Sequence, residues 1–275
     1  VGAAGEEKPV RVRLMAFQPS GVFLGAVWAT LTDAALAAAI LVCFANVAAP
    51  PQDLPWKPLA LYAPAGLATH QQLRHAAADP ARCRAALREG GVRFDESPPR
   101  REAGCSQLDA VRLRGGVTPL SPAGPVMTCG QALTYAAWDR YGLQPAAREV
   151  LGEPIASVDH MGTYACRNMY GAADGPRSEH AFANALDVGG FTTASGRKLR
   201  VLGQFEGEDR RGAFLRRSRD EACRWFRTTL SPDYNAAHGH ADTLTYELSL
   251  DGQRIVVDTG TSVYKQEPWR GVERS

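Results

Sequence analysis

Residues 178–187 read Ser-Glu-His-Ala-Phe-Ala-Asn-Ala-Leu-Asp, and this stretch decides how the chain is interpreted. It holds an imidazole, His180, and a carboxylate, Asp187, seven residues apart. If the alanine-rich chain between them turns, both side chains can converge on one cation. Histidine and aspartate suit zinc, whose catalytic sites use three protein ligands and keep one position for water. We therefore predict that His180 and Asp187 are metal ligands.

A second polar stretch lies just before the first. Residues 162–168 read Gly-Thr-Tyr-Ala-Cys-Arg-Asn. The guanidinium of Arg167 can hold a carbonyl or carboxylate through two hydrogen bonds and stabilise developing negative charge, which predicts a catalytic and substrate-binding role. The alternative for Arg167 is a structural salt bridge. Ser178 is predicted either to bind substrate or to act as a cap or turn residue in the loop.

A third group of candidates follows Asn235, where the chain reads His238-Gly-His-Ala-Asp242. His238 and His240 are candidate metal ligands, and Asp242 is a candidate general base for a metal-bound water. The alternative is that this run only begins a β-hairpin.

The surrounding periodicity predicts an α+β fold. Asp79-Pro80 interrupts the helical pattern of residues 69–89, so we expect two short helices there. Further helices are expected at residues 126–141, from Pro145 to Gly152, and at about 210–229. Short strands are expected at residues 111–117, 155–158, 185–191 and 198–203, the last two pairing, with a β-hairpin around Asp251-Gly252. These elements show no regular βαβ alternation, which favours α+β.

Residues 50–104 are predicted to be a linker with short helices. Prolines at 50, 51, 55, 58 and 64 favour an extended segment over residues 49–68. Residues 94–104 are charged and contain two prolines, which is typical of a loop.

Residues 54–238 resemble the bacterial extensin-like C-terminal domain family. The resemblance rests on residues 162–168 and 178–187, and on Phe214-Leu-Arg216, Ala222-Cys-Arg-Trp-Phe226 and Leu230-Ser-Pro-Asp-Tyr-Asn235. The family is itself similar to the zinc D-Ala-D-Ala peptidases that trim peptidoglycan. The resemblance therefore implies a Hedgehog/DD-peptidase-like domain over residues 105–238 with zinc as cofactor. His180 and Asp187 match the first two zinc ligands, and Arg167 matches the arginine that positions the substrate carbonyl.

The chain departs from the family pattern after His238. The family follows Asn-x-x-His with x-Asp-His-Phe-His, which supplies the base and the third ligand, but Thr243 stands at the third-ligand position here. His238 or His240 can substitute as ligand, with Asp242 as base. Residues 239–275 instead resemble a truncated C-terminal tail of heparinase II/III-like polysaccharide lyases, in which His240 matches a metal ligand. We hypothesise that two unrelated sequences join near residues 235–238.

The N-terminal region predicts a membrane helix. Residues 21–49 carry a single charge, Asp33, and 20 apolar residues are enough to cross a bilayer. The bases Lys8, Arg11 and Arg13 precede this run, so the positive-inside rule places residues 1–20 in the cytoplasm. We expect a single-pass protein of the bacterial inner membrane whose C-terminal part is periplasmic. A signal peptide cleaved near Ala49, giving a secreted periplasmic protein, is the main alternative, and a buried core helix is a weaker one.

Composition and cysteines fit an exported, folded domain. The 275 residues are 45% hydrophobic with a net charge of +2, too mild to indicate a nucleic-acid partner. Five of the six cysteines follow residue 50, without the spacing of a zinc knuckle. In an oxidising compartment they predict two disulfides and one free thiol, with the pairing open.

The leading function is an exported zinc metallopeptidase-like domain acting on cell-wall peptidoglycan peptides, with the third ligand and base unmatched. The alternative is a non-catalytic, disulfide-stabilised module that binds the cell wall, whether peptidoglycan or polysaccharide. A polysaccharide lyase fragment is a third hypothesis. Metal content separates the first from the second.

Overall fold

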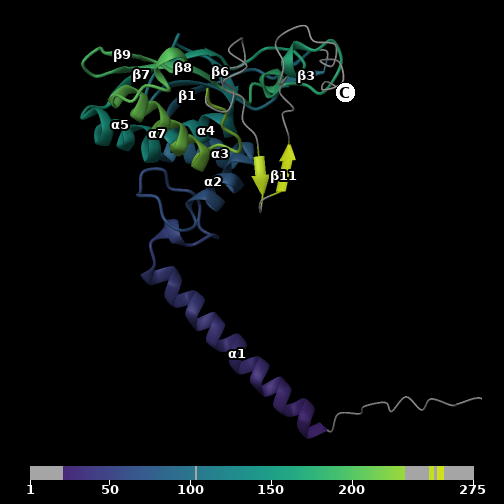
Figure 1. Cartoon of the computed structure of the whole chain (residues 1–275). Helices are drawn as coiled ribbons and strands as arrows, with labels where there is room; N and C mark the ends of the chain where they lie inside the picture. Colours follow the sequence, from purple (N-terminus) through teal and green to yellow (C-terminus); the bar gives the residue numbers. More distant parts are fainter. Residues whose placement is uncertain (1–20, 103, 233–247, 251–252, 257–275) are drawn as a thin grey trace, which may run out of the picture. The chain divides into compact units, whose positions relative to one another are not determined.

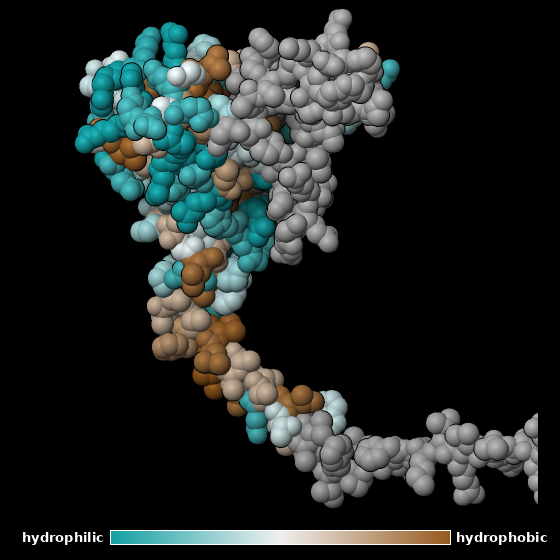
Figure 2. Space-filling view, in the orientation of Figure 1, coloured by the Kyte–Doolittle hydropathy of each residue, from teal (hydrophilic) through white to brown (hydrophobic). Residues whose placement is uncertain are grey.

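The computed structural model describes residues 21–102, 104–232, 248–250 and 253–256. The chain divides into two units, residues 1–49 and residues 50–275 (Figure 1). The first unit contributes one long helix, α1 (Gly21–Ala48). Within the described residues, Trp28–Ala48 forms the one helix that is long and apolar enough to cross a membrane, and none of it is buried. Figure 2 shows its hydrophobic surface. A signal sequence has the same properties, so α1 indicates an exported or membrane-anchored protein.

The second unit begins its helical layer with the predicted pair. Helices α2 (Thr69–Ala77) and α3 (Pro80–Glu89) are separated at the expected break. Asp79 is the N-cap of α3, where its carboxylate accepts hydrogen bonds from the backbone N–H groups of Ala81 and Arg82 at 2.9 and 3.0 Å. Pro80 occupies the first helical position, which needs no backbone donor. The break therefore starts a new helix.

Five further helical segments belong to this layer. Residue Cys129 starts α4 (Cys129–Trp138), and a π-type turn, η2 (Asp139–Leu143), leads into α5 (Gln144–Leu151). The left-handed backbone of Gly152, φ 78°, ends α5 as predicted. The short α6 (Val201–Gln204) precedes α7 (Arg210–Trp225), which ends four residues before the expected boundary.

A four-stranded sheet lies against the helices, in the order β5-β7-β8-β9. Its strands are β5 (Leu120–Ser121), β7 (Ile155–Gly162), β8 (Asp187–Thr193) and β9 (Lys198–Arg200). The predicted pairing of β8 with β9 is confirmed, with Gly190 opposite Arg200 and Thr192 opposite Lys198. A Cβ on Gly190 would lie 2.3 Å from the carbonyl oxygen of Leu199, so the close approach of these strands requires glycine there.

The described residues also form smaller sheets. A three-stranded sheet has the order β1-β4-β6, from β1 (Arg93–Glu96), β4 (Ala110–Gly115) and β6 (Val126–Thr128). Strands β2 (Arg100–Glu102) and β3 (Cys105–Gln107) pair with each other, as do β10 (Leu248–Leu250) and β11 (Gln253–Val256) at the predicted hairpin. Strands β1 and β2 occupy residues that were predicted to be a loop, so that prediction was wrong in part. Their charged side chains are exposed, and Arg88 of α3 donates to Glu96 at 2.9 Å.

Helices α4, α5 and α7 cover one face of the central sheet (Figure 1). The fully buried Phe214 of α7 meets Phe191 of β8 edge to face, with ring centroids 5.3 Å apart. Trp138 of α4 packs against the same Phe191 at 6.3 Å. Aromatic pairs in this geometry stabilise beyond the area they bury. These aromatic contacts hold β8 against the helices, and Asp187 is the first residue of β8. Mixed helices and sheets confirm the α+β prediction.

The proline-rich segment of residues 50–68 differs from the expected extended linker. Leu59 and Leu61 are 3% and 1% exposed and belong to the hydrophobic core. The Tyr141 hydroxyl lies 3.0 Å from the carbonyl oxygen of Leu61 and 2.8 Å from that of Ala63. A short 3-10 turn, η1 (Pro51–Asp53), starts the segment. Burial of the leucines thus overrides the extended tendency of the prolines, and the segment is part of the folded unit.

Candidate functional site

The imidazole of His180 and the carboxylate of Asp187 face each other inside the second unit. His180 lies in the 3-10 turn η4 (Glu179–Phe182) and Asp187 starts β8. The distance from His180 Nε2 to Asp187 Oδ1 is 3.2 Å. The two residues are only 2% and 8% exposed. The predicted convergence of these side chains is therefore confirmed by their geometry.

Neither facing atom makes a hydrogen bond within the described part of the chain. Both His180 Nε2 and Asp187 Oδ1 are buried without a hydrogen-bond partner, although they are close enough for an ion pair. The two atoms meet the distance of an ion pair but not the geometry of a hydrogen bond. Buried polar atoms are normally paired, so two orphans side by side indicate a site for a ligand that binds both.

The turn that brings these residues together is fixed by local hydrogen bonds. Ser178 is the N-cap of η4, and its hydroxyl accepts a hydrogen bond from the backbone N–H of His180 at 3.3 Å. Ser178 is itself 3% exposed. Of its two predicted roles, the structure therefore shows that of a cap. At the other end of η4, Ala183 takes a left-handed conformation, φ 55°, which is uncommon for a residue with a side chain.

Two residues that were not predicted hold this left-handed turn. The backbone N–H of Thr128 donates to the carbonyl of Ala183 at 2.9 Å. The Thr128 hydroxyl donates to the side-chain oxygen of Asn184 at 3.0 Å, and the amide of Asn184 donates to Glu179 at 2.6 Å. Asn184 lies within the decisive stretch, but Thr128 is 56 residues away and no local pattern identifies it.

The segment that carries Arg167 lies beside η4. The backbone N–H of Ser178 donates to the carbonyl of Arg167, and that of Ala165 donates to the carbonyl of His180, both at 3.1 Å. At the end of β7, Gly162 pairs with Asp187. Arg167 is half-buried. The structure thus brings the segments of Arg167, Ser178, His180 and Asp187 together.

The other predicted site residues, His238, His240 and Asp242, lie outside the described residues. Among residues 21–102, 104–232, 248–250 and 253–256, no group of three histidine, cysteine or acidic side chains is placed to hold a metal. The described part of the chain therefore contains the two predicted ligands His180 and Asp187, and the predicted third ligand lies outside it.

Two disulfides support the site, as the cysteine count predicted. Cys105–Cys166 ties β3 to the residue before Arg167, and Cys83–Cys129 ties α3 to the start of α4. One free thiol was predicted among the five cysteines after residue 50, and the structure shows that it is Cys223, which is exposed. Because Cys129 follows Thr128, both bridges reach segments that contact η4.

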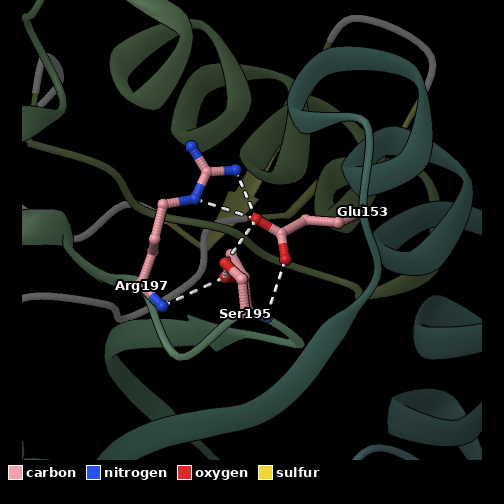
Figure 3. A network of polar contacts seen from close by, with 4 residues as sticks. Glu153, Ser195 and Arg197 are labelled. Atoms are coloured by element: carbon pink, nitrogen blue, oxygen red, sulfur yellow. Dashed lines mark hydrogen bonds and ion pairs between the residues drawn. The ribbon is translucent and has the colours of Figure 1, made fainter.

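The far end of β8 is held by a charged network around Glu153 (Figure 3). The Glu153 carboxylate accepts hydrogen bonds from Nε of Arg197 at 2.8 Å and from the backbone N–H and hydroxyl of Ser195 at 2.8 and 2.9 Å. The hydrogen bonds from Arg197 contribute most, and with those from Ser195 they lower the pKa of Glu153 from 4.5 to about 2. This network fixes the turn between β8 and β9, opposite the end that carries Asp187.

Comparison with known proteins identifies the family. The model of the family described as extensin-like protein C-terminus matches residues 81–256, more than half of the chain. The resemblance was predicted over residues 54–238, whereas the match starts at residue 81 and continues to residue 256. The resemblance of the tail to a polysaccharide lyase stays a prediction. No curated protein and no solved structure matches the chain. On the family match, this chain belongs to the extensin-like C-terminal domain family.

Proposed function

We propose that this chain is an exported zinc-dependent hydrolase domain that cleaves peptide bonds in cell-wall peptidoglycan. The observation that carries the proposal is that His180 Nε2 and Asp187 Oδ1 face each other, buried and without hydrogen-bond partners. The proposal includes the Hedgehog/DD-peptidase-like relationship and anchoring in the inner membrane through α1.

The geometry of the pair fits zinc. Zinc binds histidine nitrogen and carboxylate oxygen at about 2.0–2.2 Å in tetrahedral sites, which places two of its donors about 3.3 Å apart. His180 Nε2 and Asp187 Oδ1 are 3.2 Å apart. A neutral imidazole and a carboxylate are also the right types of zinc ligand. Two buried polar atoms without partners cost free energy, and a bound ion would remove that cost.

Each residue then has a stated role. His180 and Asp187 hold the ion, and His238 or His240 supplies the third ligand. Zinc, when bound, lowers the pKa of its water and polarises the scissile carbonyl. Arg167 binds the carbonyl oxygen and stabilises the negative charge that develops there, and Asp242 accepts the proton of the attacking water.

The remaining features fit the exported setting. The apolar helix α1 and the two disulfides indicate an exported or membrane-anchored protein. Peptidoglycan is the peptide-containing polymer that such a domain meets outside a bacterial inner membrane.

The test is peptide release from purified peptidoglycan by the full chain in detergent, with and without a zinc chelator. We expect release of new amino or carboxyl ends that is abolished by the chelator, by His180→Ala and by Asp187→Ala. His75→Ala, which removes an exposed histidine outside the site, is the control and should leave release unchanged. Arg167→Lys should lower kcat, since a lysine cannot reproduce a two-pronged hydrogen bond.

One specific observation favours a second candidate, a non-catalytic wall-binding module. The described residues provide only two metal donors, while two disulfides fix the surrounding loops. That module would bind purified peptidoglycan without releasing peptides, and its binding would survive both His180→Ala and the chelator.

A further inference from the structure

Residues 50–68 display large side chains outward on the folded unit. Trp56, Tyr62 and Leu67 are 54%, 70% and 91% exposed. Between them, Leu59, Ala60 and Leu61 are buried in the unit. This segment lies before residue 81, where the family match begins. We call these outward side chains the 56–67 face, and they lie outside the matched residues.

The 56–67 face is held in shape by hydrogen bonds. The amide of Gln72 on α2 donates to the carbonyl of Leu54 at 2.8 Å, and the side chain of Gln52 donates to the carbonyl of Ala60. Asp53 accepts from the backbone N–H of Leu67 at 2.7 Å. A segment tied at these points presents its exposed side chains as part of the fold, because its backbone cannot swing them inward.

The 56–67 face follows α1 closely in the sequence. Trp56 follows Ala48 by eight residues, which span at most about 28 Å even when fully extended. Tryptophan and tyrosine gather at the boundary between hydrocarbon and water, where an apolar ring and a polar tip are both satisfied. Lys57, between the apolar side chains, adds a positive charge suited to anionic headgroups.

We propose that the 56–67 face is a membrane-interface surface that rests in the headgroup region of the lipid bilayer. Its occupant is lipid, in the bilayer that α1 enters. Exposed apolar side chains of this kind otherwise cost free energy in water, and insertion at the interface removes Leu67 and the rings from water. This contact would hold the folded unit in a fixed orientation on its membrane, which goes beyond the proposed hydrolase activity.

The test uses the full chain in bilayers that contain anionic lipid, on a background in which the free thiols Cys43 and Cys223 are replaced by serine. An environment-sensitive fluorophore is attached to Leu67→Cys. The matched control is Leu202→Cys, at an exposed leucine (66%) on α6. Both sites are exposed, so both variants should fold. Quenching is measured with aqueous iodide and with lipids that carry a nitroxide near the headgroup.

The proposal predicts that lipid nitroxide quenches the probe at 67 several-fold more than the probe at 202, and that iodide quenches it several-fold less. Equal iodide quenching at both positions, with no lipid quenching at 67, would overturn it. Lipid quenching at both positions would also overturn it, because the unit would then lie on the bilayer without using a particular face. The inference rests on the proposed anchoring through α1, but neither readout depends on metal or on hydrolysis, so it fails or succeeds independently of the proposed hydrolase activity.

Discussion

Replacing Ser178 with alanine separates its two predicted roles. The Ser178 hydroxyl accepts a hydrogen bond from the backbone N–H of His180 at 3.3 Å, inside a turn where both residues are at most 3% exposed. Alanine at this position leaves that N–H buried without a partner. The turn that aims the imidazole then loses its cap, while every proposed metal ligand remains.

The expected magnitude follows from the lost cap. Removing an N-cap side chain costs about 1 kcal/mol, which lowers the midpoint of thermal unfolding by about 2–4 °C in a domain of this size. Loss of a residue that positions a metal ligand lowers metal affinity about 10–100-fold, equivalent to about 1.4–2.7 kcal/mol. Ser178→Ala should therefore weaken zinc binding by about 1.4–2.7 kcal/mol, more than the about 1 kcal/mol by which it weakens the fold.

The assay is a competition titration of zinc against a chromophoric chelator, run beside thermal unfolding without metal. Asp79→Ala is the matched control, because it removes the N-cap of α3, outside the proposed metal site. It should lower thermal stability and leave zinc affinity unchanged. If Ser178→Ala keeps the zinc affinity of the unmodified chain, the positioning role is wrong and direct contact with substrate becomes the better explanation.

Three further predictions concern the fold. Replacing Cys105 and Cys166 by serine should lower the free energy of unfolding by about 4 kcal/mol from loop entropy over their separation of 61 residues, whereas Cys223→Ser should leave denaturant unfolding unchanged. Phe214→Ala should cost about 3–5 kcal/mol in the same measurement, since its ring is fully buried, and a cost below 1 kcal/mol would contradict the described packing. The pKa of Glu153 is lowered from 4.5 to about 2, so its contribution to stability is complete above pH 4.5 and is lost as the pH falls through about 2. Glu153→Gln should remove this pH dependence, measured by urea unfolding at a series of pH values. An acid profile that the substitution leaves unchanged would refute the assigned network.

Local chemistry made much of the site predictable. His180 and Asp187 lie on one short stretch, so their convergence needs only a turn, and the structure shows that turn in η4. The break at Asp79 and the end at Gly152 were equally local, because a proline after a capping residue and a glycine with positive φ act on their own neighbours.

The features that the sequence left open, missed or predicted wrongly depend on distant parts of the chain. The pairing of Cys83 with Cys129 follows from the packing of α3 against α4, which no spacing reveals. Thr128 joins the site only because α4 begins beside η4. In residues 50–68 the prolines predicted an extended linker, but the core offered Leu59 and Leu61 a place to bury apolar area, and that outweighed local preference.

The central claim is that His180 and Asp187 bind a metal ion together. The most direct measurement is the zinc content of the purified full chain, by elemental analysis after dialysis, for the unmodified protein, for His180→Ala, for Asp187→Ala and for the control His75→Ala. We predict nearly one zinc per chain in the unmodified protein and in the control, and almost none in the two site variants, with all four proteins folded. Zinc absent from the unmodified chain after incubation with the ion, or retained equally by all four, would contradict the claim.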